Sequence, residues 1–303
     1  PHPHACKTAN YAVDLVNRAI REAGGPDNLV VSVSKPTMDT SKMMMQCPDV
    51  KMLVATGGPG VVRTLLSSGK KAIGAGAGNP PVIVDDTADI AKAAVDIVNG
   101  SSFDNNLPCI AEKECFVFDS VADELIKNMT QNGAYLIKGD LIDKLLKVAL
   151  IEKDGKYVIN KKWVGKDASK FLKELGIDAD PRLIICETSE NHPFVQTEMM
   201  MPILPIVRVS NIEEAIDMAV KAEHGCRHSA HIHSKNVDRL TAFARAVETT
   251  IFVKNAPSYA GIGAGGEGYT TFTIAGPTGE GLTAAHSFTR YRRCVMADGL
   301  HIV

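Results

Sequence analysis

The sequence predicts an α/β fold in which helices cover a parallel sheet. Short β-branched runs alternate with segments of helical periodicity along most of the 303 residues, which is typical of βαβ units. Hydrophobic residues make up 45% of the chain, enough to bury a large core in two domains. The net charge of -2 gives no attraction for nucleic acid or an anionic membrane. The longest apolar runs are too short to span a bilayer.

The first part of the chain is predicted to alternate helices and strands as far as residue 98. Apolar residues recur at helical spacing over 10–20, behind Asn10 as a candidate N-cap. Further strands are expected at 28–33 and 51–55, and helices at 40–46, 60–68 and 87–98. The stretch 72–81 is so rich in glycine that we expect a crossing between domains there.

A second α/β unit is predicted beyond that crossing. Its strands are expected at 115–118, 182–186, 203–209, 229–233 and 250–253, and its helices at 121–132, 141–148, 168–175, 212–222 and 237–246. Residues 255–283 are rich in Gly, Thr and Pro and are expected to form an ordered loop. The end, 288–303, alternates apolar and charged residues like an exposed edge strand, which invites pairing with another chain.

The cysteines indicate a reducing compartment. All seven are scattered without CxxC pairs, and no secretory signal is present, so the sequence predicts free thiols in a cytoplasmic protein. They are Cys6, Cys47, Cys109, Cys115, Cys186, Cys226 and Cys294.

Cys109 is the candidate nucleophile among them. It follows the polar stretch 104–106, and Pro108 restrains the backbone directly before it. A thiolate can attack a carbonyl carbon. A buried, unreactive thiol is the alternative for any cysteine, and Cys115, inside a strand run, is predicted to be of that kind.

A strand–turn–helix signature at 53–62 suits the phosphates of a dinucleotide. Its turn consists of Thr56, Gly57 and Gly58, and backbone N–H groups at the start of a helix bind anions. Such glycine turns occur in many α/β proteins, and no GxGxxG fingerprint is present. By itself this turn is therefore weak evidence.

Together, this turn and the Cys109 segment resemble the CoA-acylating aldehyde dehydrogenases of the ethanolamine- and propanediol-utilisation type. The resemblance covers essentially the whole chain, which lacks roughly the first third of the family's length. It implies an aldehyde dehydrogenase-like fold with a partial NAD-binding parallel-sheet domain at 1–75 and an α/β catalytic domain at 76–275. A C-terminal return segment and oligomerisation strand are implied at 276–303. In this family an asparagine from the first third helps to stabilise the oxyanion.

The chemistry implied by the resemblance is NAD-dependent oxidation of a short aldehyde to an acyl-CoA. The Cys109 thiolate attacks the aldehyde, hydride passes from the thiohemiacetal to nicotinamide, and coenzyme A, the co-substrate, takes the acyl group from the thioester. Glu198, in the segment 196–205, matches the family's glutamate that holds the ribose hydroxyls of the nicotinamide. The alternative is a solvated loop glutamate.

Gly74 bears on how the thioester is released. In hydrolytic relatives the matching position holds a glutamate that activates water, and the stretch 73–76 has no carboxylate. Losing a general base costs on the order of 10²–10⁴-fold in the assisted step, so we expect a thiol acceptor rather than water. The alternative is that Glu267 or Glu280 supplies the base from a loop.

The segment 223–233 contains four histidines and a cysteine, which raises the question of a metal site. Arg227 places a positive charge inside it, and the spacing matches no zinc pattern, so no metal is predicted. In the resembling family this segment is a structural strand.

The resemblance also implies partners. We expect a small aldehyde, coenzyme A, a second copy of the chain bound through 288–296, and microcompartment shell or cargo proteins, inside a bacterial microcompartment. Two alternatives stay open: a catalytically incomplete fragment that serves as a scaffold or assembly partner, and a hydrolytic aldehyde dehydrogenase.

Overall fold

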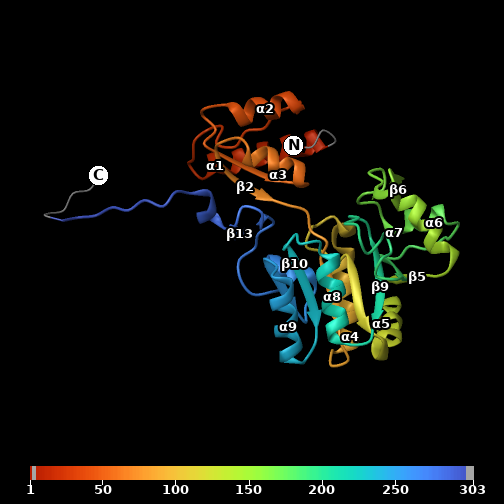
Figure 1. Cartoon of the computed structure of the whole chain (residues 1–303). Helices are drawn as coiled ribbons and strands as arrows, with labels where there is room; N and C mark the ends of the chain where they lie inside the picture. The colour runs from red at the N-terminus through yellow and green to blue at the C-terminus, as the bar shows by residue number, and fades with distance from the viewer. Residues whose placement is uncertain (2–4, 298–303) are drawn as a thin grey trace. The chain divides into compact units, whose positions relative to one another are not determined.

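The computed structural model describes Pro1 and residues 5–297. The chain divides into two compact units. The first unit consists of Pro1–Ala55 and Arg63–Ile73, and the second of Thr56–Val62 together with the chain from Gly74 onward. Figure 1 labels the elements of both units.

The first unit is mainly helical. Its helices are α1 (Cys6–Glu22), α2 (Met38–Gln46) and part of α3 (Pro59–Leu66), and the strands β1 (Met52–Thr56) and β2 (Lys71–Ala75) form a two-stranded sheet. Thr37 caps α2, accepting a hydrogen bond from the backbone N–H of Thr40.

The predicted strand at 28–33 is wrong, because this segment consists of turns and irregular chain. Asn28 has a positive φ of 57°, which a strand does not allow. The side chain of Asn17 binds both polar groups of Val30, donating to its carbonyl at 2.7 Å and accepting from its N–H at 3.2 Å. A strand would use these two groups for its ladder.

The predicted domain crossing at 72–81 is only partly irregular. Its first residues belong to β2, and β3 begins at its end with Pro81–Val84. The strand continues through Gly74 because glycine allows close packing there: a Cβ on Gly74 would lie 2.9 Å from Cγ1 of Val62. The glycines therefore serve a packing contact as well as a bend.

The second unit is built on a seven-stranded sheet in the order β11-β10-β3-β4-β9-β8-β5, and all its pairs are parallel. The strands are β3, β4 (Glu114–Phe118), β5 (Ala134–Ile137), β8 (Leu183–Glu187), β9 (Ile203–Val209), β10 (Ser229–His233) and β11 (Ile251–Lys254). The sequence predicted five of them and missed β3 and β5. β3 pairs with β4 on one side and with β10 on the other.

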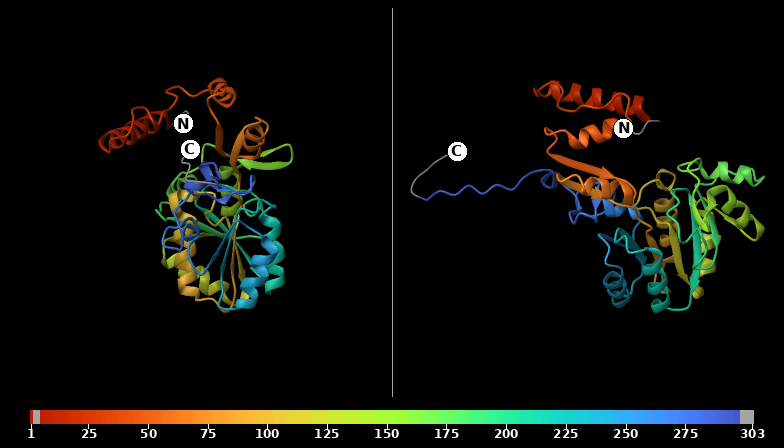
Figure 2. Two further views of the ribbon diagram at one scale, coloured as in Figure 1. Left: turned by 90° about the vertical axis from the view of Figure 1, so that its left-hand side faces the viewer. Right: turned by 45° about the horizontal axis from the view of Figure 1, so that its top comes forward.

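Helices cover both faces of this sheet (Figure 2). The helices α4 (Ile90–Ser102) and α5 (Asp119–Gln131) pack with Val82 and Val84, whereas α8 (Ile212–Ala222) and α9 (Val237–Val247) pack with Ile83 on the opposite face. The alternation along β3 follows from the two-residue period of a strand. In a sheet that is buried on both faces, the sequence of each strand is a nearly continuous apolar run, as it is in these strands.

A third core cluster lies beside β5 and includes α6 (Asp140–Ala149) and α7 (Ala168–Glu174). The hairpin β6 (Leu150–Lys153) and β7 (Lys156–Ile159) follows α6. The sequence analysis missed this hairpin, although its Asp154-Gly155 turn, with φ of 52° and 70°, is a strong hairpin signal.

The loop expected at 255–283 is largely irregular, with a 3₁₀ turn (Ser258–Ile262) and the short pair β12 (Ile274–Ala275) and β13 (Gly281–Leu282). Over its described part, the segment predicted as a strand at 288–303 forms no strand within the chain: a 3₁₀ turn (Ala285–Phe288) precedes irregular chain up to residue 297. A strand formed there with a second chain stays a prediction. Residues 298–303 lie outside the described residues. A strand is defined by its ladder partner, and no described strand of this chain pairs with the tail.

Over the described residues, none of the helices combines the length and the apolar character that crossing a membrane requires.

Candidate active site at the amino-terminal edge of the sheet

Titratable side chains gather where several strands of the large sheet begin. Cys109 and Lys113 precede β4, and Glu114 is its first residue; Glu198 precedes β9, and His228 precedes β10. Because parallel strands all begin at one edge, residues distant in sequence meet there. The charges of Cys109, Glu114 and Glu198 all act on Lys113.

The loop before Cys109 has an unusual backbone. Asp104, Asn105 and Asn106 all have positive φ, of 46°, 53° and 64°. Left-handed conformations cost most residues about 1–2 kcal/mol each, and aspartate and asparagine tolerate them best. The polar stretch that marked this segment in the sequence therefore allows a turn that few other residue types would form.

Side-chain amides hold this turn. Asn105 donates to the carbonyl of Gly165 at 3.1 Å and to Oδ1 of Asp167 at 3.0 Å. The buried Asn106 donates to the carbonyls of Ser101 at 2.8 Å and Glu112 at 3.0 Å. The loop is thus fixed from two sides.

Cys109 is half-buried at the end of this loop, and its thiol experiences opposing influences. Burial raises the pKa of the Cys109 thiol and the carboxylate of Glu198 raises it further, whereas the Lys113 ammonium and the N–H groups of Cys109 and Ile110 act to lower it. A thiol in such surroundings depends on its cationic neighbour to form the nucleophilic thiolate.

Cys115, the alternative nucleophile, is fully buried in β4. Burial raises the pKa of its thiol strongly. It packs among apolar side chains such as Val82 and Ile206, as expected for a core residue.

Glu198 is half-buried and belongs to the same group as Cys109. Burial raises the pKa of its carboxyl, while the Lys113 ammonium and the backbone N–H of Gly78 act to lower it. The solvated-loop alternative does not fit these surroundings, since a solvated carboxylate has no such burial effect.

His228 belongs to this site, although the sequence analysis assigned its segment to structure alone. Nδ1 lies 2.8 Å from Oγ of Ser229, and the buried Nε2 has no hydrogen-bond partner within the described chain. Burial, followed by the charge of Lys113, lowers the pKa of His228 to about 4, so the ring is neutral at pH 7. A Cβ on Gly78 would lie 2.7 Å from the ring, so only glycine fits beneath it.

Two buried carboxyl groups complete the edge. Glu112 accepts a hydrogen bond from the backbone N–H of Ser258 at 3.0 Å, and burial raises its pKa to about 7. Neither carboxyl oxygen of Glu114 has a hydrogen-bond partner among the described residues. Burial raises the pKa of Glu114 well above its usual value, against the opposing charge of Lys113, and so favours the protonated carboxyl.

The candidate phosphate-binding turn lies apart from this hydrogen-bond network in the described chain. Thr56 ends β1, and the N–H of Gly57 donates to the carbonyl of Ala75 at 3.0 Å. One of the three expected amides is thus used within the protein. Gly58 lies directly before α3, with open space around its Cα.

The carboxylate of Glu280 is connected to Gly74 through one intervening side chain, that of Thr278. The N–H of Gly74 donates to Oγ1 of Thr278 at 3.1 Å, and the Thr278 hydroxyl in turn donates to Glu280. The alternative base Glu280 is thus held by a neighbouring hydroxyl.

No group of three or more potential metal-ligating side chains comes together among the described residues. His231 and His233 are buried in β10, and burial lowers their pKa values to about 3 and about 4. They behave as neutral core residues of the strand.

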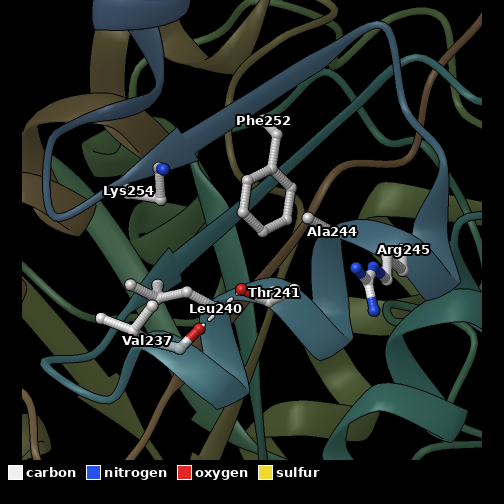
Figure 3. A pocket seen from close by; sticks show the side chains of 7 residues that line it. All are labelled: Val237, Leu240, Thr241, Ala244, Arg245, Phe252 and Lys254. Carbon is white, nitrogen blue, oxygen red and sulfur yellow. Dashed lines mark hydrogen bonds between the residues drawn. The ribbon is translucent and has the colours of Figure 1, made fainter.

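A separate pocket of about 420 Å³ lies between α9 and the edge strand β11 (Figure 3). Its lining is apolar apart from Thr241, Arg245 and Lys254, and the Thr241 hydroxyl already donates to the carbonyl of Val237. Since this lining has no cysteine and no carboxylate, we place the candidate active site at the Cys109 edge.

The chain is similar to known proteins over its whole length. The acetylating acetaldehyde dehydrogenase of Salmonella typhimurium is 48% identical over 308 aligned positions, which cover all of this chain and 66% of the relative. A propionaldehyde dehydrogenase from Rhodopseudomonas palustris, solved with propionyl-CoA, superposes with a TM-score of 0.94 at 55% identity, covering 98% of this chain and 66% of that one. The same enzyme has been solved with CoA and an acylated cysteine.

A propionaldehyde dehydrogenase from a fucose-utilisation microcompartment of Clostridium phytofermentans gives a TM-score of 0.94 at 56% identity, covering 99% of this chain and 69% of that one. The chain thus spans about two thirds of the length of these relatives. Residues 5–289 match the aldehyde dehydrogenase family as a whole, and the chain therefore belongs to the aldehyde dehydrogenase family.

Proposed function

We propose that the protein oxidises a short aldehyde to an acyl-CoA, with Cys109 as the nucleophile. The observation that carries the proposal is the arrangement around Cys109: a half-buried thiol on a rigid loop, with the Lys113 ammonium and the Glu198 carboxylate acting on it. Relatives at 48% and 50% identity are named as acetylating and CoA-propanoylating enzymes, and a propionaldehyde dehydrogenase at 55% identity was solved with CoA and an acylated cysteine.

The residues of the site fit the steps of this reaction. The Cys109 thiolate attacks the aldehyde carbon, so a C–S bond forms and the carbonyl oxygen becomes an oxyanion. The N–H of Cys109 is available to stabilise that charge. A nicotinamide dinucleotide supplies the hydride acceptor, and loss of hydride restores the carbonyl as a thioester. Attack by the CoA thiolate then expels the Cys109 thiolate and yields the acyl-CoA.

The cofactor assignments rest on chemistry. Glu198, held by its neighbours at the edge of the site, offers a carboxylate that can accept two ribose hydroxyl bonds. Gly58, at the start of α3, suits a phosphate through its backbone, and Thr56 adds a hydroxyl. An engineered glycolyl-CoA reductase that is 54% identical to this chain holds NADP⁺, which supports a nicotinamide cofactor here.

The test combines turnover and a half-reaction. The purified protein is supplied with propionaldehyde, NAD⁺ and CoA, and NADH and propionyl-CoA are measured. Separately, propionyl-CoA alone is added and acylation of Cys109 is measured by mass spectrometry. We expect both signals in the wild type, neither in Cys109→Ala, and both in Cys115→Ala as the control. Turnover that survives in Cys109→Ala would refute the assignment.

The acceptor is tested by leaving out coenzyme A. We expect little free propionate without it, because Gly74 offers no side-chain base to activate water. Rapid release of free acid in the absence of coenzyme A would instead support the hydrolytic alternative, with Glu280 as the candidate base.

We further propose a homo-oligomer that works in the cytoplasm, inside a bacterial microcompartment. One relative comes from such a compartment. In the described tail, Tyr291, Val295 and Met296 are 90%, 76% and 60% exposed, as an interface strand without its partner would be. Deleting 288–303 should convert the oligomer to monomers in light scattering, and an unchanged oligomer would show that the tail is not the interface.

A further inference from the structure

Lys113 lies four residues after Cys109 and is only 2% exposed. Lysine is almost never fully buried unless its charge is paired. Its Nζ points back at the Cys109 loop and donates to the carbonyl of Asn106 at 2.9 Å, to Oδ1 of Asn106 at 2.6 Å and to the carbonyl of Pro108 at 3.2 Å.

These three bonds indicate the protonation state. All three partners are oxygens that only accept, and the Asn106 amide nitrogen is already used toward Ser101 and Glu112. An ammonium has three N–H donors, whereas a neutral amine has only two. Burial lowers the pKa of Lys113 to about 8, so the ammonium still dominates at pH 7.

The titratable groups around this ammonium come from four segments. They are Cys109 and Glu112 on the loop, Glu114 on β4, Glu198 before β9 and His228 before β10. His228 is neutral at pH 7, because its pKa is lowered to about 4, and burial raises the pKa of Glu114 well above its usual value. The negative charges that can compensate Lys113 at pH 7 are therefore Glu198, a Cys109 thiolate and the ionised fraction of Glu112, whose pKa is raised to about 7.

The Pro108 carbonyl accepts hydrogen bonds from Lys113 Nζ at 3.2 Å and from the Ala111 N–H at 3.1 Å. The two bonds together fix the direction of the next amide. The described chain has no cis peptide bond, and in a planar trans peptide the C=O and the following N–H point in opposite directions. Since the Pro108 carbonyl points at Lys113, the Cys109 N–H must point away from it. This is the N–H that stabilises an oxyanion in the proposed reaction.

We propose that Lys113 is a positioning residue for Cys109: together with the Ala111 N–H, its ammonium holds the Pro108 carbonyl and so sets the direction of the Cys109 N–H, and its charge stabilises the Cys109 thiolate. The proposal rests on the proposed function, in which Cys109 is the nucleophile. It also explains the left-handed turn at 104–106, because the same ammonium binds both the backbone and the side chain at the end of that turn.

The first test measures the thiolate without aldehyde, NAD⁺ or CoA. The rate of Cys109 alkylation by iodoacetamide is followed from pH 6 to about 12, so that a raised midpoint stays within the range, with the site located by mass spectrometry. In Lys113→Met we expect the midpoint to rise by about one pH unit and the rate at pH 7 to fall about tenfold. The control is Lys92→Met, which removes a lysine bonded to Asp96 and to the Asn255 carbonyl and should leave the profile unchanged.

The second test separates charge from geometry. Lys113→Arg keeps the charge but cannot place three donors at one nitrogen. We expect its alkylation midpoint to stay near the wild-type value while kcat for aldehyde oxidation falls about 10²-fold, the range for losing one oxyanion donor. If Lys113→Met does not fold, Lys113→Arg decides alone: a wild-type kcat overturns the positioning role, and a shifted midpoint overturns the charge role.

The outcomes distinguish this proposal from the proposed function. If the wild type forms no acyl-CoA but the alkylation profiles move as expected, the function fails and the role of Lys113 stands. If the wild type forms acyl-CoA and Lys113→Met matches it in both alkylation and turnover, the role of Lys113 is wrong and the function stands.

Discussion

The two edges of the seven-stranded sheet differ in the hydrogen bonds that their buried carboxyl groups accept. At the carboxyl-terminal edge, Asp85 is fully buried and accepts bonds from Thr87 N–H at 2.8 Å, Thr87 Oγ1 at 2.6 Å and Ser234 Oγ at 2.6 Å, with Arg239 at 3.0 Å. At the amino-terminal edge, Glu114 is equally buried and has no such donor among the described residues.

The pKa shifts follow this difference. Burial acts to raise the pKa of Asp85, but the bonds from Ser234, Thr87 and Arg239 outweigh it and the pKa is lowered. Burial raises the pKa of Glu114 without such compensation. The buried carboxyl group at one edge is therefore satisfied, whereas Glu112 and Glu114 at the other edge keep carboxyl oxygens without a partner among the described residues, as functional sites commonly do. In this sheet the proposed chemistry lies at the edge where buried carboxyl oxygens lack hydrogen-bond donors among the described residues.

A matched pair of substitutions should give the largest contrast. Asp85→Asn places an amide nitrogen against the donors Ser234 and Arg239, or against Thr87, and should cost about 3 kcal/mol of unfolding free energy. In Glu114→Gln a neutral amide replaces a carboxyl group whose protonated form is favoured. It should change the free energy of unfolding by less than about 1 kcal/mol at pH 5. Urea unfolding of both variants measures the difference. Equal losses at the two edges would contradict the comparison.

The same pair should differ in pH dependence. Burial raises the pKa of Glu114 in the fold above its usual value of 4.5, so its contribution to stability is fully present below pH 4.5 and falls as the pH rises, by up to about 1.4 kcal/mol per unit. Glu114→Gln removes this slope, and its advantage should grow from pH 5 to 7. Asp85 has a lowered pKa, so its contribution is present above 3.8 and is lost as pH falls through the folded value. A pH-independent difference between wild type and Glu114→Gln would show that Glu114 is ionised in the fold.

The smallest effect is expected from a single methyl group at the amino-terminal edge. Gly78→Ala places a Cβ 2.7 Å from the His228 ring and should cost about 1 kcal/mol or somewhat more. Gly60→Ala is the control, since nothing lies within 4 Å of its Cβ, and alanine in a helix should be neutral or stabilising. Thermal unfolding compares the two, and equal melting temperatures would show that the His228 ring moves aside without cost.

Periodicity predicted the strands and helices of the second unit well, because their apolar patterns repeat with the period of the element. It failed where tertiary contacts decide. In the segment 28–33, the N–H and C=O of Val30 bind the Asn17 side chain instead of a neighbouring strand. The strand β3 was not predicted because it directly follows a glycine-rich stretch. Nothing local in the sequence distinguishes Gly74 in a strand from a glycine in a loop.

The site was predicted in part for the same reason. Cys109 and Glu198 were predicted through the resemblance of their segments, and in the structure the charges of both act on Lys113. Lys113 itself gave no signal, because a lysine next to two glutamates reads as a solvated surface residue. His228 was hidden in a run of histidines, where only the fold separates the core residues His231 and His233 from the one that faces the site.

The position of β3 in the middle of the sheet has a consequence for synthesis of the chain. Its neighbour β4 follows within a few tens of residues, but its other neighbour, β10, is about 150 residues further on. At a translation rate of about 5–20 residues per second, one side of β3 waits roughly 7–30 s for its partner. During that interval the growing chain presents an apolar strand edge of the kind that recruits foreign strands, so the centre of the finished sheet is the part that most needs protection before release from the ribosome.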